Sequence, residues 1–233
     1  MTSNDRLIVA LDVADFESAK KLVEEISDEV VFYKIGLEMM MSGSYFQVIE
    51  WLKNKNKKIF ADLKLYDISE TVGRAVANLA QYEIDLLTIH TASSSIMKQA
   101  VANKGKMKIL GVTVLTNLDQ NDLSEMGFDP KILLEDLVVK KAKLAIESGL
   151  DGVVASALEA KNLREKLGSN FSIVTPGIRL EAIPSDDQKR VTDVKTALQN
   201  GSSQLVVGRP ITRDANPRIA AQRFNRLIGE IAR

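Results

Sequence analysis

Short apolar runs alternate with amphipathic helical stretches along the whole chain, and this alternation most constrains the fold. The runs are continuously apolar, which indicates strands covered on both faces of a sheet. The predicted strands lie at residues 7–12, 30–36, 58–64, 86–90, 108–115, 152–157, 171–177 and 204–210. Eight strands alternating with about eight helices predict a (β/α)8 TIM barrel. A doubly wound open sheet is the main alternative, because periodicity alone does not exclude it.

Two of the helical stretches show a clear apolar face. In residues 16–27 this face consists of Ala19, Leu22, Val23 and Ile26. The closing stretch, from residue 216, has a proline near its start, as helices often do. Its predicted inner side consists of Ile219, Phe224, Leu227, Ile228 and Ile231.

The chain is predicted to be a single domain over residues 1–233, because no linker or composition break divides it. The first strand leads into DVADFES rather than a glycine-rich turn, which argues against a dinucleotide-binding fold. The patch KNKNKK at 53–58 is interpreted as a solvated helix end that leads into the third strand.

Composition excludes several classes of function. The 31 basic and 31 acidic side chains balance, whereas a nucleic-acid partner would select a basic face. The absence of cysteine rules out disulfides and thiolate chemistry. No apolar stretch approaches the roughly 18–20 residues that a membrane span needs. We therefore expect a soluble, cytoplasmic protein with no nucleic-acid and no membrane partner.

Charged residues end three successive strands, at the edge where a barrel carries its active site. Asp12 ends the first, Lys34 lies near the end of the second, and Asp62 and Lys64 end the third, with Asp67 just beyond. Residues two apart on a strand point the same way, so Asp62 and Lys64 share a direction. Each could be an ordinary strand-end charge turned to solvent. Their alternating signs instead favour a mutually neutralising network.

Such a network has a chemical use. A lysine flanked by carboxylates keeps its proton and is a fixed proton donor, while a carboxylate pressed against an anionic substrate group raises the energy of that group. A magnesium site built from Asp12, Asp62 and Asp67 is conceivable, but Lys34 and Lys64 compete for the same carboxylates.

The last two strands are followed by loops of the kind that bind phosphate. TPGIR (175–179) and VVGRPI (206–211) each combine a glycine with an arginine, Arg179 and Arg209. The polar segment 180–188 between them is predicted to be a lid. His90 ends the fourth strand; we expect a hydrogen-bonded structural or pocket-wall role rather than a general base.

The sequence motifs of this chain resemble those of the orotidine 5′-phosphate decarboxylase family, in its bacterial short form. The resemblance rests on motifs spread over nearly the whole chain: LIVALDV, YKIG, DLKLYDI, GVTVLTNLDQNDL, LDGVVASALEA, VTPGIR, DQKR and VVGRPIT. It implies cofactor-independent, metal-free decarboxylation of orotidine 5′-monophosphate to UMP, the last step of de novo pyrimidine nucleotide synthesis. It also implies a homodimer.

The resemblance assigns roles by position. Lys64 matches the lysine that protonates C6, and Asp62 matches the carboxylate placed against the substrate carboxylate. Asp67 matches an aspartate that crosses the dimer interface, alongside Ile68 and Thr71. Lys34 and Asp12 match ligands of the ribose hydroxyls, Lys34 being also part of the charge network. The remaining matches to substrate-binding residues are Thr116, Pro176, Arg179, Gln188, Gly208 and Arg209.

The chain departs from the family's usual pattern at Tyr66 and at Ser69–Glu70, beside Asp67. Two other functions remain open. A related branch of barrels acts on keto-gulonate-type sugar phosphates with magnesium and shares the DxK element. A non-catalytic phosphoribosyl-ligand sensor is the second alternative, although the charged set is complete here.

Overall fold

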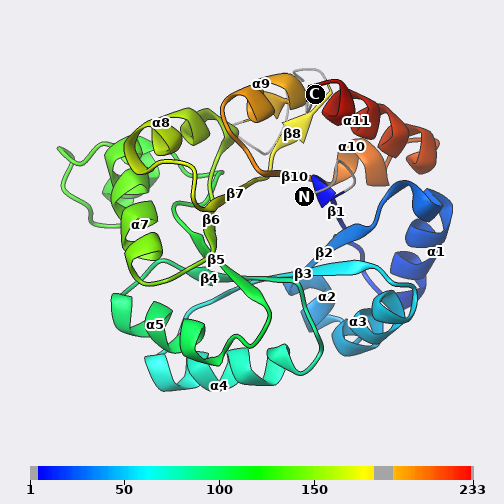
Figure 1. Ribbon diagram of the computed structural model, residues 1–233, viewed down its shortest axis with the longest axis horizontal. Helices are drawn as coiled ribbons and strands as arrows, with labels where there is room; N and C mark the ends of the chain where they lie inside the picture. The colour runs from blue at the N-terminus through cyan, green and yellow to red at the C-terminus, as the bar shows by residue number, and fades with distance from the viewer. Residues whose placement is uncertain (1–4, 181–190, 232–233) are drawn as a thin grey trace.

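The computed structural model describes residues 5–180 and 191–231. Its centre is a closed barrel of parallel strands in the order β1-β10-β7-β6-β5-β4-β3-β2, surrounded by helices (Figure 1). The barrel strands are β1 (Leu7–Ala10), β2 (Phe32–Gly36), β3 (Lys58–Leu65), β4 (Leu86–His90), β5 (Lys108–Val112), β6 (Gly152–Val154), β7 (Ser172–Thr175) and β10 (Gln204–Val207). The predicted (β/α)8 barrel is confirmed, and each predicted run overlaps one barrel strand, β3 extending one residue past its predicted end.

Helices follow the strands around the ring. They are α1 (Phe16–Ile26), the 3-10 turn η2 (Ser27–Glu29), α2 (Leu37–Met41), α3 (Tyr45–Asn54), α4 (Ser69–Ala80), α5 (Ser94–Asn103), α6 (Gln120–Glu125), α7 (Leu134–Glu147), α8 (Ala157–Leu167), α9 (Val194–Gln199), α10 (Arg209–Thr212) and α11 (Pro217–Ile231). A short separate ladder joins β8 (Ile178–Arg179) to β9 (Thr192–Asp193). None of these helices is long and apolar enough to cross a membrane.

Two apolar clusters explain why the strands lack an alternating pattern. The larger one lies between the strands and the helices, and it includes the predicted face of α1. The smaller one fills the barrel interior. Its buried members are Ile8, Ala10, Phe32, Phe60, Leu86, Leu110, Val174 and Val206. Both faces of each strand are therefore apolar, and the inward positions nearer the carboxyl ends are left for other side chains.

The amino-terminal end of the barrel is closed by one arrangement that occurs three times. Asp85 donates its backbone N–H to the Ile59 carbonyl, and its Oδ2 accepts from the Ile59 N–H at 2.9 Å. Asp151 does the same with Ile109 at 2.9 Å. Ser203 repeats it with the backbone of β7 through its hydroxyl. These side chains fix neighbouring strands together where the ladder begins.

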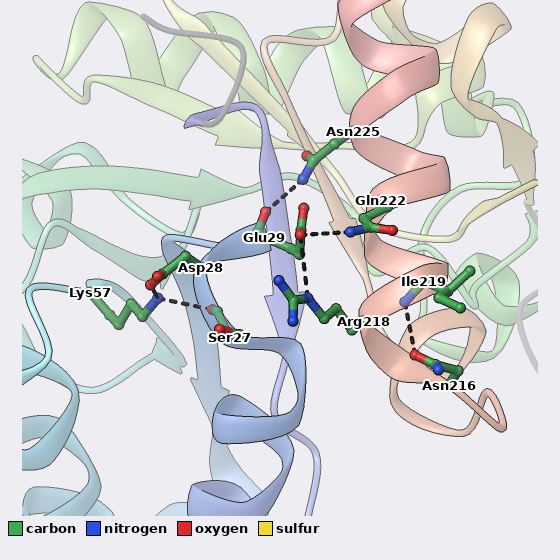
Figure 2. A network of polar contacts seen from close by, with 9 residues as sticks. All are labelled: Ser27, Asp28, Glu29, Lys57, Asn216, Arg218, Ile219, Gln222 and Asn225. Atoms are coloured by element: carbon green, nitrogen blue, oxygen red, sulfur yellow. Dashed lines mark hydrogen bonds and ion pairs between the residues drawn. The ribbon is translucent and has the colours of Figure 1, made fainter.

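The turn η2 is joined to the last helix, α11, through Glu29 (Figure 2). Its Oε1 accepts from Gln222 at 2.7 Å and from Arg218 at 3.4 Å, and its carbonyl accepts from Asn225 at 2.6 Å. Helix α11 buries Ala220, Ala221, Phe224 and Ile228, so the predicted inner side is confirmed except at Ile219, which is 44% exposed.

The interpretation of KNKNKK as fully solvated is wrong at one residue. Lys57 is buried, and its ammonium donates to the carbonyls of Ser27 at 3.1 Å and Val30 at 3.0 Å. Asp28 adds an ion pair at 3.5 Å (Figure 2). The alternation KNK gave no sign of this, because the acceptors are backbone atoms of a distant turn.

Candidate active site

Four charged side chains form an alternating row at the carboxyl ends of β1, β2 and β3. Lys34 Nζ lies 2.8 Å from Asp12 Oδ1 and 3.6 Å from Asp62 Oδ2, and Lys64 Nζ lies 2.9 Å from Asp62 Oδ1. The order is therefore Asp12–Lys34–Asp62–Lys64, which brings together four of the five charges of the predicted network and leaves out Asp67. Each inner member has two opposite charges as neighbours.

The row is partly withdrawn from solvent, and this changes its protonation. Burial alone would lower the pKa of Lys34, but the Asp62 and Asp12 carboxylates outweigh it and raise that pKa above its ordinary value. Burial alone would likewise raise the pKa of Asp62, but Lys34 and Lys64 hold it below its ordinary value. The Lys34 and Asp62 side chains are only 11% and 14% exposed, yet both stay charged.

The row lines a cavity of about 540 Å³. Its floor includes the inward apolar residues Phe60 and Val206 of the barrel interior. The predicted residues that line it are Asp12, Lys34, Asp62, Lys64, Thr116, Pro176, Arg179, Gly208 and Arg209. The lining therefore combines the charged row with two arginines. Together they form a site for an anionic, polar ligand.

Two glycines lie at or beside this site, and only one of them is needed for its backbone shape. A β-carbon on Gly36 would make ordinary van der Waals contact, 3.4 Å from Lys34 Nζ and 3.6 Å from the Asp62 carbonyl. Gly177 has φ +76°, which favours glycine, and it lies in the cavity wall beside Pro176. The turn at Gly177 leads directly to Arg179, which is buried.

Asp67, Ile68 and Thr71 are not among the residues that line this cavity. Asp67 is exposed, its Oδ1 accepts from the backbone N–H of Ile68 at 2.7 Å, and it forms no ion pair with any residue in the described part of the chain. Ile68 is 69% exposed, and Thr71 is half-buried on α4. Gln188 and all of the predicted lid except Leu180 lie outside the described residues.

His90 lies beside this cavity rather than in its lining. Its ring meets Tyr66 edge to face, with 5.8 Å between centroids. Burial, together with the charges of Lys141 and Lys64, lowers the pKa of His90. A neutral imidazole packed on an aromatic ring fits a structural role rather than the pocket-wall role, because His90 is not among the lining residues. The predicted hydrogen bond of its ring is not seen among residues 5–180 and 191–231.

Thr88 belongs to this site, and sequence reasoning missed it. It is fully buried on β4, donates to Asp62 Oδ1 at 2.9 Å, and accepts from the Lys64 backbone N–H at 2.9 Å. The signal in LLTIH was one hydroxyl at an inward position, two residues beyond the interior residue Leu86. No group of three or more His, Asp or Glu side chains in the described chain is placed to hold a metal ion.

Comparison with known proteins supports one family over nearly the whole chain. Residues 5–224 match the model of the orotidine 5′-phosphate decarboxylase / HUMPS family. Orotidine 5′-phosphate decarboxylase of Methylococcus capsulatus is 49% identical over 97% of this chain and 93% of its own length. The enzyme of the same name from Nitrobacter winogradskyi is 47% identical over 99% of this chain and 95% of its own length.

A solved structure agrees with the fold. The crystal structure of orotidine 5′-phosphate decarboxylase from Lactobacillus acidophilus superposes with a TM-score of 0.85 at 34% identity, covering 96% of this chain and 99% of that one.

Proposed function

The chain belongs to the orotidine 5′-phosphate decarboxylase / HUMPS family, and from this we propose that it converts orotidine 5′-monophosphate to UMP and CO2. This reaction is the last step of de novo pyrimidine nucleotide synthesis, and we propose that it needs no metal or organic cofactor. One observation carries the proposal: the row Asp12–Lys34–Asp62–Lys64 shares a single cavity with Arg179 and Arg209.

The proposed chemical step uses Lys64 and Asp62. The substrate carboxylate lies against Asp62, whose charge raises the energy of the bound ground state. The bond from C6 to the carboxylate carbon breaks, CO2 leaves, and the electron pair stays on C6. Lys64 Nζ gives a proton to that pair, and the neutral amine regains a proton from water. The fixed ammonium therefore stabilises charge where it develops.

The two arginines are proposed to hold the 5′-phosphate at the other side of the cavity. Arg179 and Arg209 line it together with Pro176 and Gly208, and we place Gln188 with them from the resemblance. Asp12 and Lys34 are proposed ligands of the ribose hydroxyls, and Thr116 contacts the substrate. Phosphate binding far from C6 contributes energy that positions the reacting carbon.

We further propose that the enzyme is a homodimer in which Asp67 serves the partner's site, with Ile68 and Thr71 beside it. The support is that Asp67 is exposed and that Tyr66 and Ile68, on either side, are each 69% exposed. Large exposed apolar side chains on both sides of a polar residue are typical of an interface between proteins.

Mixing two inactive variants tests this shared site. A Lys64→Ala chain supplies Asp67, and an Asp67→Ala chain supplies Lys64, so a mixed dimer has one complete site. Random re-association of equal amounts should restore about a quarter of the wild-type activity. If Asp67 acted within its own chain, the mixture would stay inactive.

The activity itself is tested by following the absorbance change as orotidine 5′-monophosphate is consumed, with and without EDTA. We expect turnover that the chelator does not change. Turnover of a sugar phosphate that EDTA abolishes would support the magnesium-dependent branch instead. Tight binding of the nucleotide without formation of UMP would support the sensor.

A further inference from the structure

Lys64 has an unusual backbone. Its φ is +49°, in the left-handed region that side chains with a β-carbon rarely adopt. Residues in such conformations persist only where their surroundings hold them. The strand parity that predicted a shared direction for Asp62 and Lys64 is therefore not what brings them together, since the strand is not regular at Lys64.

The irregularity is a bulge in the ladder between β3 and β4. Ala61 pairs with Leu87, but the next pair is Leu65 with Ile89. Three residues of β3, 62–64, thus stand opposite a single residue of β4, which is Thr88. A bulge leaves backbone groups without their usual ladder partners.

The Thr88 side chain takes the place of the missing ladder acceptor. Its Oγ1 accepts from the Lys64 N–H at 2.9 Å, and its one hydroxyl hydrogen goes to Asp62 Oδ1 at 2.9 Å. The same Oδ1 accepts from Lys64 Nζ at 2.9 Å. A closed ring results, in which one hydroxyl joins the backbone of the lysine to the carboxylate that holds its ammonium.

We propose that Thr88 is a positioning residue for decarboxylation: its hydroxyl fixes the bulge at Lys64 and the orientation of Asp62, and so sets where the proton donor lies. This inference deepens the proposed function and rests on it. Thr88 is fully buried and does not line the cavity, so it acts through Lys64 and Asp62 rather than on the substrate.

The hydroxyl also bears on the protonation of Asp62, because its hydrogen bond is one of the causes that lower the Asp62 pKa. Without this bond the ionised carboxylate of Asp62 loses a hydrogen-bond donor that stabilises it, so the pKa of Asp62 should rise. The titratable groups that face Asp62 or act on it are Lys34 on β2, Lys64 on β3, His90 on β4, Tyr45 on α3 and Asp12 beyond β1. None of these changes in a Thr88 variant.

Thr88→Val is the direct test, because valine keeps the branched shape and removes only the hydroxyl. We expect kcat to fall on the order of 10- to 100-fold with KM changed less than about threefold, since a small displacement of a catalytic group costs this much. The acid limb of the kcat/KM profile should move to higher pH. Thr88→Ser should recover activity to within a few-fold of wild type, and Thr88→Ala serves if the valine variant does not fold.

The matched control is Thr91→Val. Thr91 is buried at the same end of the barrel, does not line the cavity, and donates its hydroxyl to the Val112 carbonyl at 2.7 Å. It should lose stability without losing kcat. Equal kcat values for Thr88→Val and Thr91→Val, or an unmoved acid limb, would overturn the proposal.

A crystal structure of Thr88→Val gives a readout independent of activity, because φ of Lys64 should leave the left-handed region or Asp62 should rotate. Unchanged geometry at both residues would contradict the positioning role. A wild-type enzyme inactive toward orotidine 5′-monophosphate would instead refute the proposed function, and this outcome is seen before any variant is made.

Discussion

The two ends of the barrel use the same kinds of charged residue for opposite purposes. At the amino-terminal end, the carboxylates of Asp85 and Asp151 accept from backbone N–H groups of the preceding strands. At the carboxyl end, Asp62 accepts from Lys64 and Thr88, and both lysines of the row line a cavity. A larger depression, about 760 Å³, lies at the amino-terminal end, so cavity size does not identify the site.

The difference lies in what neutralises each charge. A carboxylate that accepts hydrogen bonds from backbone amides stabilises the strand pairing, and its oxygens are then not available to a ligand. A carboxylate paired with lysine ammonium groups that line a cavity leaves their protons and charge available to a ligand. In a barrel of this type, residues at the amino-terminal face contribute to stability and residues at the carboxyl face to catalysis. The following variants test this division between a stabilising end and a catalytic end, and the first two compare one matched residue from each end.

The largest effect is expected for two lysines of the same strand. Lys64→Ala removes the proposed proton donor and should lower kcat by more than about 10⁴-fold. Lys58, at the other end of β3, pairs with Asp5 at 2.6 Å and is 44% exposed. Lys58→Ala should leave kcat within about threefold and cost under about 1 kcal/mol of unfolding free energy. Turnover assays and urea denaturation measure both, and full activity of Lys64→Ala would refute its role.

Two arginines give the next contrast. Arg209→Ala should raise KM about 10- to 100-fold through loss of the proposed phosphate contact, with kcat changed much less. Arg164, at the amino-terminal end, donates to the Gly201 and Phe171 carbonyls. Arg164→Ala should lower the unfolding free energy by about 1–3 kcal/mol with KM unchanged. If KM changed in Arg164→Ala and not in Arg209→Ala, substrate binding would belong to the amino-terminal end of the barrel instead.

An acidic residue tests the stabilising end directly. Asp151→Ala removes the acceptor of the buried Ile109 N–H and the partner of Lys104. The unfolding free energy should fall by about 2–3 kcal/mol, because a backbone donor and a lysine lose their partner. The protein that remains folded should keep the wild-type kcat. A loss of kcat with unchanged stability would show that this end also takes part in catalysis.

The smallest effect concerns pH. The folded pKa of Asp62 lies below its ordinary value of 3.8, so its ionisation stabilises the protein above pH 3.8 and that contribution is lost as the pH falls through the lowered value. Urea denaturation of the wild type and Asp62→Asn at several pH values checks this. The difference in their unfolding free energies should be constant near neutral pH and should shrink only below pH 3.8. A wild type that already gains stability relative to Asp62→Asn as the pH falls from 6 to 5 would mean a raised pKa instead.

Several features of the site follow from the sequence because they depend on local pattern and chain order. The apolar runs located every barrel strand, and the parallel topology brings their carboxyl ends together. Asp12, Lys34 and Asp62 therefore meet although they are far apart in the chain. The roles of the site residues, the homodimer, the single domain and the cytoplasmic location stay predictions.

The two errors have different causes. Lys57 is bound by carbonyls of a distant turn, which no local pattern reveals. Ile219 is exposed because Ala220 and Ala221 pack inward instead, so hydrophobicity alone did not fix which residues of the first turn face the core.

The sequence by itself determined the barrel, the row of alternating charges and the two arginines of the cavity, since each depends on which residue ends which strand. The tertiary structure alone decided that β3 bulges opposite Thr88 and that Lys64 takes a left-handed backbone. The reason is physical: these features depend on the register between neighbouring strands, and hydrogen bonds across the ladder, not residue order, set that register.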